Sequence, residues 1–147
     1  MSINTEEFMR EFNQWVAQTN RAYDDTLAAT ALDMFSKIVR RTPVDSGRLR
    51  GNWQVGLGSA PSGVNTTTDR GGSTATNNAR AVLSSYRGGS IYFSNNLPYA
   101  MVAEYGLWGD GPKTSGGFSN QAPSGMVRVT LTEFTSALQA AARNNRI

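Results

Sequence analysis

The sequence predicts an α+β fold in which a long N-terminal helix and a C-terminal helix pack on a small, mainly antiparallel sheet, with two long loops. Three observations predict it. Apolar residues recur at helical spacing through the first 42 residues, which contain neither Pro nor Gly. Residues 48–57 and 90–95 have the composition of strands, and two polar stretches separate the elements. With 147 residues, one domain spanning 1–147 is the natural expectation.

The first helix is predicted to begin at Asn4, which can cap it together with Glu7 as in a capping box. It would run for about 37 residues, or roughly 55 Å, and end at Thr42 because Pro43 follows. That is long for a small domain, so the helix either bends near residues 18–20 or extends its first half toward a neighbour. The second half fits an ordinary amphipathic core helix.

The middle of the chain is predicted to supply the sheet. Residues 44–47 form a turn by composition, and residues 48–57 alternate apolar with polar side chains, as in a half-buried strand. Residues 58–78 are polar and predict a long loop. Residues 79–87 have the spacing of a short helix, and residues 90–95 are rich in side chains that suit a second strand.

Residues 96–106 predict a strand end, one short helix and a glycine stop. Pro98 suits the first helical turn, and Gly106 suits a left-handed position after the last one. Glu104 is a carboxylate in an otherwise apolar helix, so it needs a partner if it is buried.

The C-terminal part is predicted to be a loop followed by a helix. Residues 106–121 contain five glycines and form the second long loop. Apolar residues then recur at spacings of four and three, which predicts a helix from about Val127 to Arg143. Pro123 and Ser124 mark its start.

The residue types argue against catalysis. The chain has no Cys and no His, which removes thiolate ligands, the commonest zinc ligand and the commonest general base. A phosphate loop at residues 109–114 fails because Pro112, which lacks an N–H, precedes the Lys-Thr pair. We therefore expect no enzyme activity, no cofactor and no metal. The N-terminus is polar and acidic rather than a signal peptide, and no apolar run predicts membrane association.

The charges are distributed unevenly. Residues 37–87 carry eight Lys or Arg against two Asp, whereas residues 1–36 carry six acidic residues against two Arg. This asymmetry suits head-to-tail contact between copies of the chain. It also suits nucleic acid, with Trp53 and Tyr86 as candidate stacking residues.

Three segments carry a resemblance to a known family. Residues 42–50 read Thr-Pro-Val-Asp-Ser-Gly-Arg-Leu-Arg and are followed by Trp53; residues 96–106 contain Pro-Tyr-Ala and then Glu-Tyr-Gly; residues 121–130 would open the last helix. In this order they resemble the minor tail protein Z-like, or tail-completion, proteins of long-tailed bacteriophages, with Ser46 where the family has Thr. The matching motif positions that we single out are Pro43, Asp45, Gly47, Arg48, Arg50, Pro98, Tyr99, Glu104 and Gly106.

The resemblance implies a structural virion protein of the neck or tail, assembled in the host bacterial cytoplasm. Its copies would form a ring, expected to be a hexamer, at the head–tail junction, and genomic DNA would pass through without sequence-specific contact. Other neck and tail proteins would be its partners. One alternative is a tail terminator or head–tail connector ring; another, of a different class, is a DNA-binding module.

Two structural expectations follow. Glu104 should form a salt bridge with Arg48 or Arg50, which the family layout places nearby. The two long loops should be assembly surfaces that order only in the ring, because they hold too few apolar residues to pack alone. The candidate interface residues are Arg70, Trp108, Lys113 and Phe118. For Trp108 the alternative is that it folds back over the core of its own chain.

Overall fold

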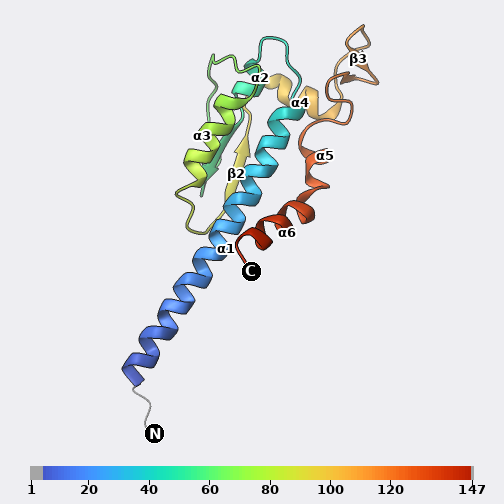
Figure 1. Ribbon diagram of the computed structural model, residues 1–147. Coiled ribbons are helices and arrows are strands. Elements are labelled where there is room, and N and C mark those ends of the chain that lie inside the picture. The colour runs from blue at the N-terminus through green and yellow to red at the C-terminus, as the bar shows by residue number, and fades with distance from the viewer. Residues whose placement is uncertain (1–4, 147) are drawn as a thin grey trace.

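The computed structural model describes residues 5–146 and shows a helical and strand-containing body from which one helix projects (Figure 1). The predicted α+β class is confirmed. In chain order the elements are α1 Thr5–Arg41, α2 Arg48–Gly51, β1 Gln54–Leu57, α3 Ser73–Leu83, β2 Ile91–Ser94, α4 Pro98–Tyr105, β3 Thr114–Ser115, β4 Phe118–Ser119, α5 Val127–Leu131 and α6 Phe134–Asn144.

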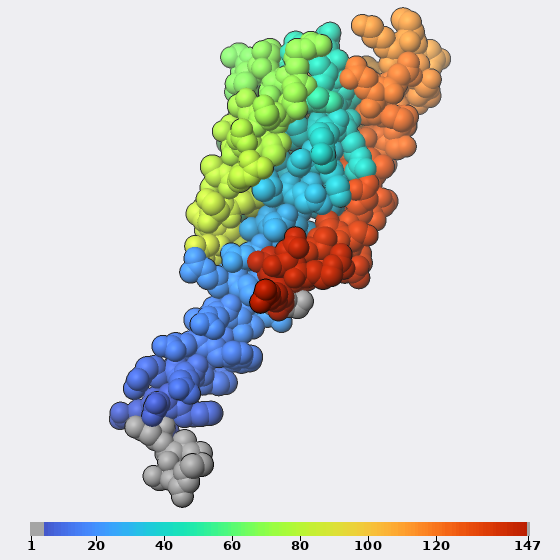
Figure 2. Space-filling model, in the orientation of Figure 1, coloured from blue at the N-terminus to red at the C-terminus, as the bar shows by residue number. Residues whose placement is uncertain are grey.

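The long N-terminal helix is confirmed as α1, which runs without interruption for 37 residues. Its first buried residue is Thr26, and residues 5–25 extend away from the body (Figures 1 and 2). We call residues 5–25 the arm. The first half of the helix therefore projects from the body rather than breaking near residues 18–20. The predicted cap at Asn4 lies outside the described residues.

The central sheet is a two-stranded antiparallel pair. Val55 of β1 lies opposite Phe93 of β2, and Leu57 lies opposite Ile91. The second half of α1 packs against α3 and reaches the sheet through Phe35, whose ring meets Phe93 edge-on with the centroids 5.4 Å apart. Phe35 is fully buried at the centre of the core.

The first strand is shorter than predicted. Residues 48–51 form one helical turn, α2, in which the Gly51 N–H donates to the Gly47 carbonyl over 3.0 Å. Leu49 is buried in either conformation, so the alternation of apolar residues did not distinguish a turn from a strand. Two side chains hold this turn: Asn52 Nδ2 donates to the Arg48 carbonyl over 2.8 Å, and Arg50 donates to three backbone carbonyls described below.

The helix α3 begins earlier than predicted, at Ser73 rather than near residue 79. The carboxylate of Asp69 accepts the Ala75 N–H over 2.8 Å and so caps the first turn from outside it. Polar residues 73–78 look loop-like in sequence, and the predicted loop over residues 58–78 is correspondingly shorter.

The last predicted helix is divided into α5 and α6. The break falls at Glu133, whose carboxylate pairs with Lys37 Nζ at 3.1 Å and with the guanidinium of Arg41. These ion pairs attach the break to α1, and α6 then packs along α1 (Figure 1). Hydrogen bonds from Arg41 and, to a smaller extent, from Lys37 hold the pKa of Glu133 below its usual value. Hydrogen bonds to Asp33 and, to a smaller extent, to Glu133 raise the pKa of Lys37.

Candidate functional site

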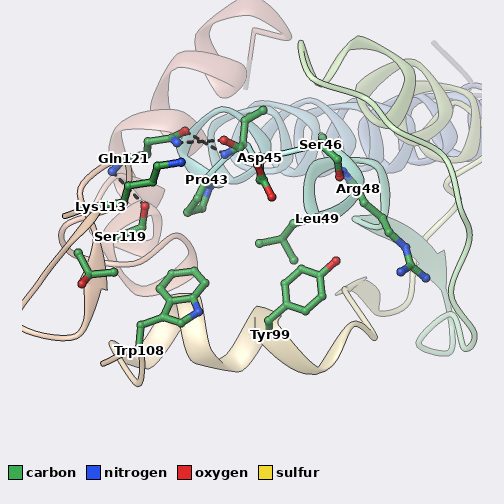
Figure 3. A pocket seen from close by; sticks show the side chains of 13 residues that line it. Pro43, Asp45, Ser46, Arg48, Leu49, Tyr99, Trp108, Lys113, Ser119 and Gln121 are labelled. Atoms are coloured by element: carbon green, nitrogen blue, oxygen red, sulfur yellow. Dashed lines mark hydrogen bonds between the residues drawn. The ribbon is translucent and has the colours of Figure 1, made fainter. Parts of the chain in front are cut away.

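A hollow of about 550 Å³ lies between the turn that follows α1, the helix α4 and the hairpin β3–β4 (Figure 3). We call it the turn pocket. The side chains of Asp45, Leu49 and Tyr99 project toward it from two sides (Figure 3). Its lining residues are Pro43, Val44, Asp45, Ser46, Gly47, Arg48, Leu49, Tyr99, Trp108, Lys113, Thr114, Ser119 and Gln121.

The two walls of the turn pocket are fastened by Gln121. The Val44 N–H donates to Gln121 Oε1 over 2.9 Å, and Gln121 Nε2 donates to the Val44 carbonyl over 3.0 Å. This pair of bonds mimics one step of a β ladder and joins segments 77 residues apart. The hairpin is thus held against the turn by its own chain.

The turn pocket brings together two groups of residues that the sequence singled out separately. Five motif positions line it, and so do the interface candidates Trp108 and Lys113. The motif residues in this set are Pro43, Asp45, Gly47, Arg48 and Tyr99. The remaining motif and interface candidates, Arg50, Pro98, Glu104, Gly106, Arg70 and Phe118, are not among the lining residues.

The prediction that Glu104 forms a salt bridge with Arg48 or Arg50 was wrong. Glu104 is buried, with 6% of its surface exposed, but its carboxylate binds the start of α5 instead of Arg48 or Arg50. The backbone N–H groups of Met126, Val127 and Arg128 donate to it over 2.7, 2.8 and 2.9 Å. Glu104 therefore caps α5 from another helix.

Arg128 completes this contact. Its Nε donates to Glu104 Oε2 over 3.1 Å, its Nη2 donates to the Glu104 carbonyl over 2.6 Å, and its guanidinium lies 4.5 Å from the ring centroid of Tyr105. A side chain on Gly125 would collide with Glu104, since an added Cβ would lie 2.7 Å from the Glu104 carbonyl oxygen. The N–H groups at the start of α5 have no capping side chain from their own helix and so need an acceptor from elsewhere, which was the signal that could have identified this partner.

Burial and hydrogen bonding act in opposite directions on Glu104. Burial would raise the pKa of the carboxyl group, but the backbone N–H groups of Arg128, Met126 and Val127 and the Arg128 side chain outweigh it. The pKa is consequently lowered from its usual value, and the group is a carboxylate at neutral pH.

Arg50 holds the turn and the first loop to the end of α1. Its Nε donates to the Thr42 carbonyl over 2.8 Å, its Nη2 to Arg40 over 2.8 Å and its Nη1 to Arg70 over 2.6 Å. Burial lowers the pKa of the guanidinium, against the opposing charge of Asp69. Arg48 instead donates to the Asn65 carbonyl over 3.3 Å.

Arg50→Lys is expected to destabilise the protein by about 2 kcal/mol, because an ammonium cannot donate to three separated carbonyls in one plane. Chemical denaturation measures this change. The control is Arg48→Lys, which changes a half-buried guanidinium with one long bond. Equal midpoints for the two variants would contradict the anchoring role of Arg50.

The loop aromatics are anchored within their own chain. Trp108 is half-buried and packs against the core, so the alternative in which it folds back is the observed one. Phe118 lies against Gly106, where an added Cβ would come within 2.4 Å of the ring. Gly106 has the left-handed conformation predicted for it, with φ of 66°.

The first long loop is also held by contacts that the sequence reasoning overlooked. Asn52 Oδ1 accepts the Asn65 N–H over 2.9 Å, and Asn96 Nδ2 donates to the Gly63 carbonyl over 2.8 Å. Arg70 donates to the carbonyl of Asp45. Hydrogen bonds from polar side chains, together with the Pro61 ring packed close to Gly56, thus give residues 58–72 a defined path.

The arm is a second candidate site; the sequence predicted that this half of the helix either bends or extends toward a neighbour, but did not single out its aromatic side chains. Phe8, Phe12 and Trp15 lie along one side of it with 56%, 47% and 61% of their surfaces exposed. Neighbouring rings have centroids 6.3 and 6.1 Å apart. Three exposed aromatic rings in a row are unusual for a helix that faces only water and indicate an interaction surface.

The ionisable residues do not gather into a site of another kind. Within residues 5–146, no group of three or more acidic side chains is placed to hold a metal ion. None of the helices in that range has the length and apolar character needed to cross a bilayer.

A projecting helix with exposed aromatics, joined to a body with an open pocket, fits a protein that assembles with other molecules. The chain matches the family described as "Bacteriophage HK97-gp10, putative tail-component" over residues 6–106, and it belongs to that family. It is a phage tail component and hence a structural protein of the virion. The match ends at Gly106, so the hairpin, α5 and α6 lie beyond it. Comparisons with curated proteins and with solved structures found no match.

Proposed function

We propose that the protein is a tail-completion component whose copies form a closed ring at the junction of head and tail, with genomic DNA passing through the centre. Membership of a tail-component family sets the class. The observation that carries the finer proposal is the arm, because residues 5–25 contain no buried residue and yet expose three aromatic rings. A single chain leaves that surface in water, so assembly is required to cover it.

The shape of the chain favours a ring over a two-fold dimer. The arm lies at one end of the molecule, and the turn pocket lies at the other (Figures 1 and 3). An arm that projects from one end can bind a different surface on the next copy, and such heterologous contacts close into rings when the rotation allows it. Six copies is the number that the resemblance implies.

The turn pocket and the loops around it are proposed to contact other tail and neck proteins. The exposed Lys113 and the 65%-exposed Leu107 stand beside the half-buried Trp108 on this surface. An exposed cation next to apolar side chains suits a partner with an acidic rim around an apolar centre.

A DNA-binding module is the alternative of a different class. The two aromatics that would have stacked on bases, Trp53 and Tyr86, are 7% and 4% exposed and are therefore occupied in the core. Several arginines of the basic region donate to backbone carbonyls, as Arg50, Arg70 and Arg87 do. These guanidinium groups are therefore engaged within their own chain, which counts against phosphate contact by them.

Particles assembled without this protein test the proposal. We expect DNA-filled heads and finished tails of normal length that fail to join, and joining after purified protein is added. Tails of irregular length would instead identify a tail terminator. The DNA-binding alternative would be supported if the purified protein bound bare DNA in a salt-dependent way and heads and tails joined normally without the protein. Lys113→Glu in the same joining assay tests the surface beside the turn pocket.

A further inference from the structure

An apolar groove of about 330 Å³ lies at the base of the arm, between α1, the start of β2 and the junction of α5 with α6. We call it the basal groove. None of its lining residues carries a charge at neutral pH. Leu131 and Phe134 at its edge expose 56% and 44% of their surfaces. The lining residues are Leu27, Thr30, Ala31, Met34, Tyr86, Gly89, Ile91, Phe93, Leu131 and Phe134.

The arm and the basal groove share one face of α1. Phe8, Phe12 and Trp15 are followed at helical spacing by the exposed Tyr23 and Leu27, and Leu27 is the first residue of the groove. The stripe and the groove thus lie along the same helix, one projecting and one recessed, with the polar residues 18–20 between Trp15 and Tyr23. Such a face fits the binding mode in which a helix lays its apolar side into a groove.

The arm cannot fill the groove of its own chain. Trp15 and Leu27 are twelve residues apart in one uninterrupted helix, a separation of roughly 18 Å along the axis. Folding the arm back would require breaking α1, which contains neither Pro nor Gly. The occupant must therefore come from another molecule.

We propose that the arm of one subunit docks in the basal groove of the next copy, head to tail. Charge supports this occupant: residues 5–16 carry three Glu against one Arg, while Arg87, next to the groove residue Tyr86, belongs to the basic region. Three aromatic side chains bury roughly 150–250 Å² each. Because 47–61% of each side chain is exposed on the single chain, docking newly buries about half of that area, which is less than half of the roughly 800 Å² per partner of a stable interface. The exposed Tyr23 and Leu27 further along α1 add to it.

This inference rests on the proposed ring but specifies a contact that can fail independently of it. Since docking in one direction leaves each subunit with a free arm and a free groove, it must continue from copy to copy until the ring closes. The isologous alternative, in which two arms exchange reciprocally, would stop at a dimer.

Cysteine cross-linking in the assembled protein tests the docking, because the natural chain has no Cys to interfere. The test variant is Phe12→Cys with Leu131→Cys, treated with a short bis-maleimide. The matched control is Phe12→Cys with Thr74→Cys, since Thr74 is exposed and lies at the far end of α3 from Tyr86. We expect a ladder from dimer to hexamer in the test variant, at least about ten-fold stronger than in the control.

The outcomes separate the two proposals. A ladder that extends beyond the dimer supports the docking; a product that stops at the dimer overturns it. Rings seen by native mass spectrometry without cross-links would overturn the docking and leave the proposed function standing. A ladder in a protein that is absent from the neck would support the docking and overturn the proposed function. Phe12→Asp changes a side chain that is 47% exposed in one chain, so it is expected to abolish rings while leaving the melting temperature of the unassembled chain unchanged.

Discussion

Replacing Glu104 with Ala is expected to destabilise the protein by about 3–5 kcal/mol, because it removes a buried carboxylate that satisfies several donors at once. Three backbone N–H groups and Arg128 would lose their acceptor at the start of α5. Glu104→Gln should cost less but remain destabilising, since one carboxylate oxygen is replaced by an amide that cannot accept. Denaturant-induced unfolding measures both changes. Glu11→Ala, at an exposed position on the arm, is the matched control.

The contact between Glu104 and the start of α5 should make the free energy of unfolding depend on pH. The pKa of Glu104 is lowered in the folded protein, so its contribution is fully present above the unfolded value of about 4.3 and is lost as the pH falls through the folded value. Glu104→Gln should therefore have a flatter stability profile than the natural protein below about pH 4.3. Parallel profiles, or a loss in Glu104→Ala no greater than in the exposed control, would contradict the capping role.

Trp53→Ala is expected to cost about 3–5 kcal/mol, because it leaves a large cavity where β1 meets α1. Trp53 is 7% exposed, and its Nε1–H donates over 2.8 Å to Thr42 Oγ1. Thr42 in turn donates to the Ile38 carbonyl over 2.7 Å. The indole thus fills the core and also ties the sheet to the end of the long helix. Thermal or chemical unfolding measures the loss.

Trp15→Ala is the informative control for Trp53→Ala. Trp15 is 61% exposed on the arm, so its removal should leave unfolding of the single chain within about 0.5 kcal/mol of the natural protein. Assembly should respond in the opposite way, with rings lost in Trp15→Ala. A Trp53→Ala variant as stable as the natural protein would contradict the packing described for β1.

Local patterns predicted the elements that depend on local chemistry. The helix α1 follows from uninterrupted helical spacing, and α4 follows from Pro98 at its start and Gly106 at its end. The strand at residues 91–94 follows from its composition. In each of these the neighbours in sequence supply the decisive interactions.

The errors arise where distant residues supply those interactions. The break before α6 depends on Glu133 reaching Lys37 and Arg41 of α1. The start of α3 is a different case: Asp69 accepts from the nearby Ala75, and the polar composition of residues 73–78 concealed the helix. Burial of Glu104 could be inferred from its apolar helix, but its partner is chosen by packing against the segment before α5. Neither periodicity nor composition carries that information.

The candidate sites, like the secondary structure, combine features visible in local sequence with features that arise only on folding. Motif residues and interface candidates were identified separately, and only folding brings members of both to the turn pocket. Trp108 and Phe118 were candidates for a partner contact, with folding back over the core as the alternative for Trp108; the structure packs Trp108 against the core and Phe118 against Gly106. The aromatic stripe of the arm was visible as periodicity, yet its exposure depends on where the body of the protein ends.

A side-chain-resolution reconstruction of the assembled particle at the head–tail junction is the most direct test of the proposed ring. We predict a closed ring of this protein, expected to contain six copies, with DNA in the channel and the aromatic stripe of each arm seated in the basal groove of the adjacent copy. A junction in which this protein is absent, or is present only as isolated copies, would contradict the account.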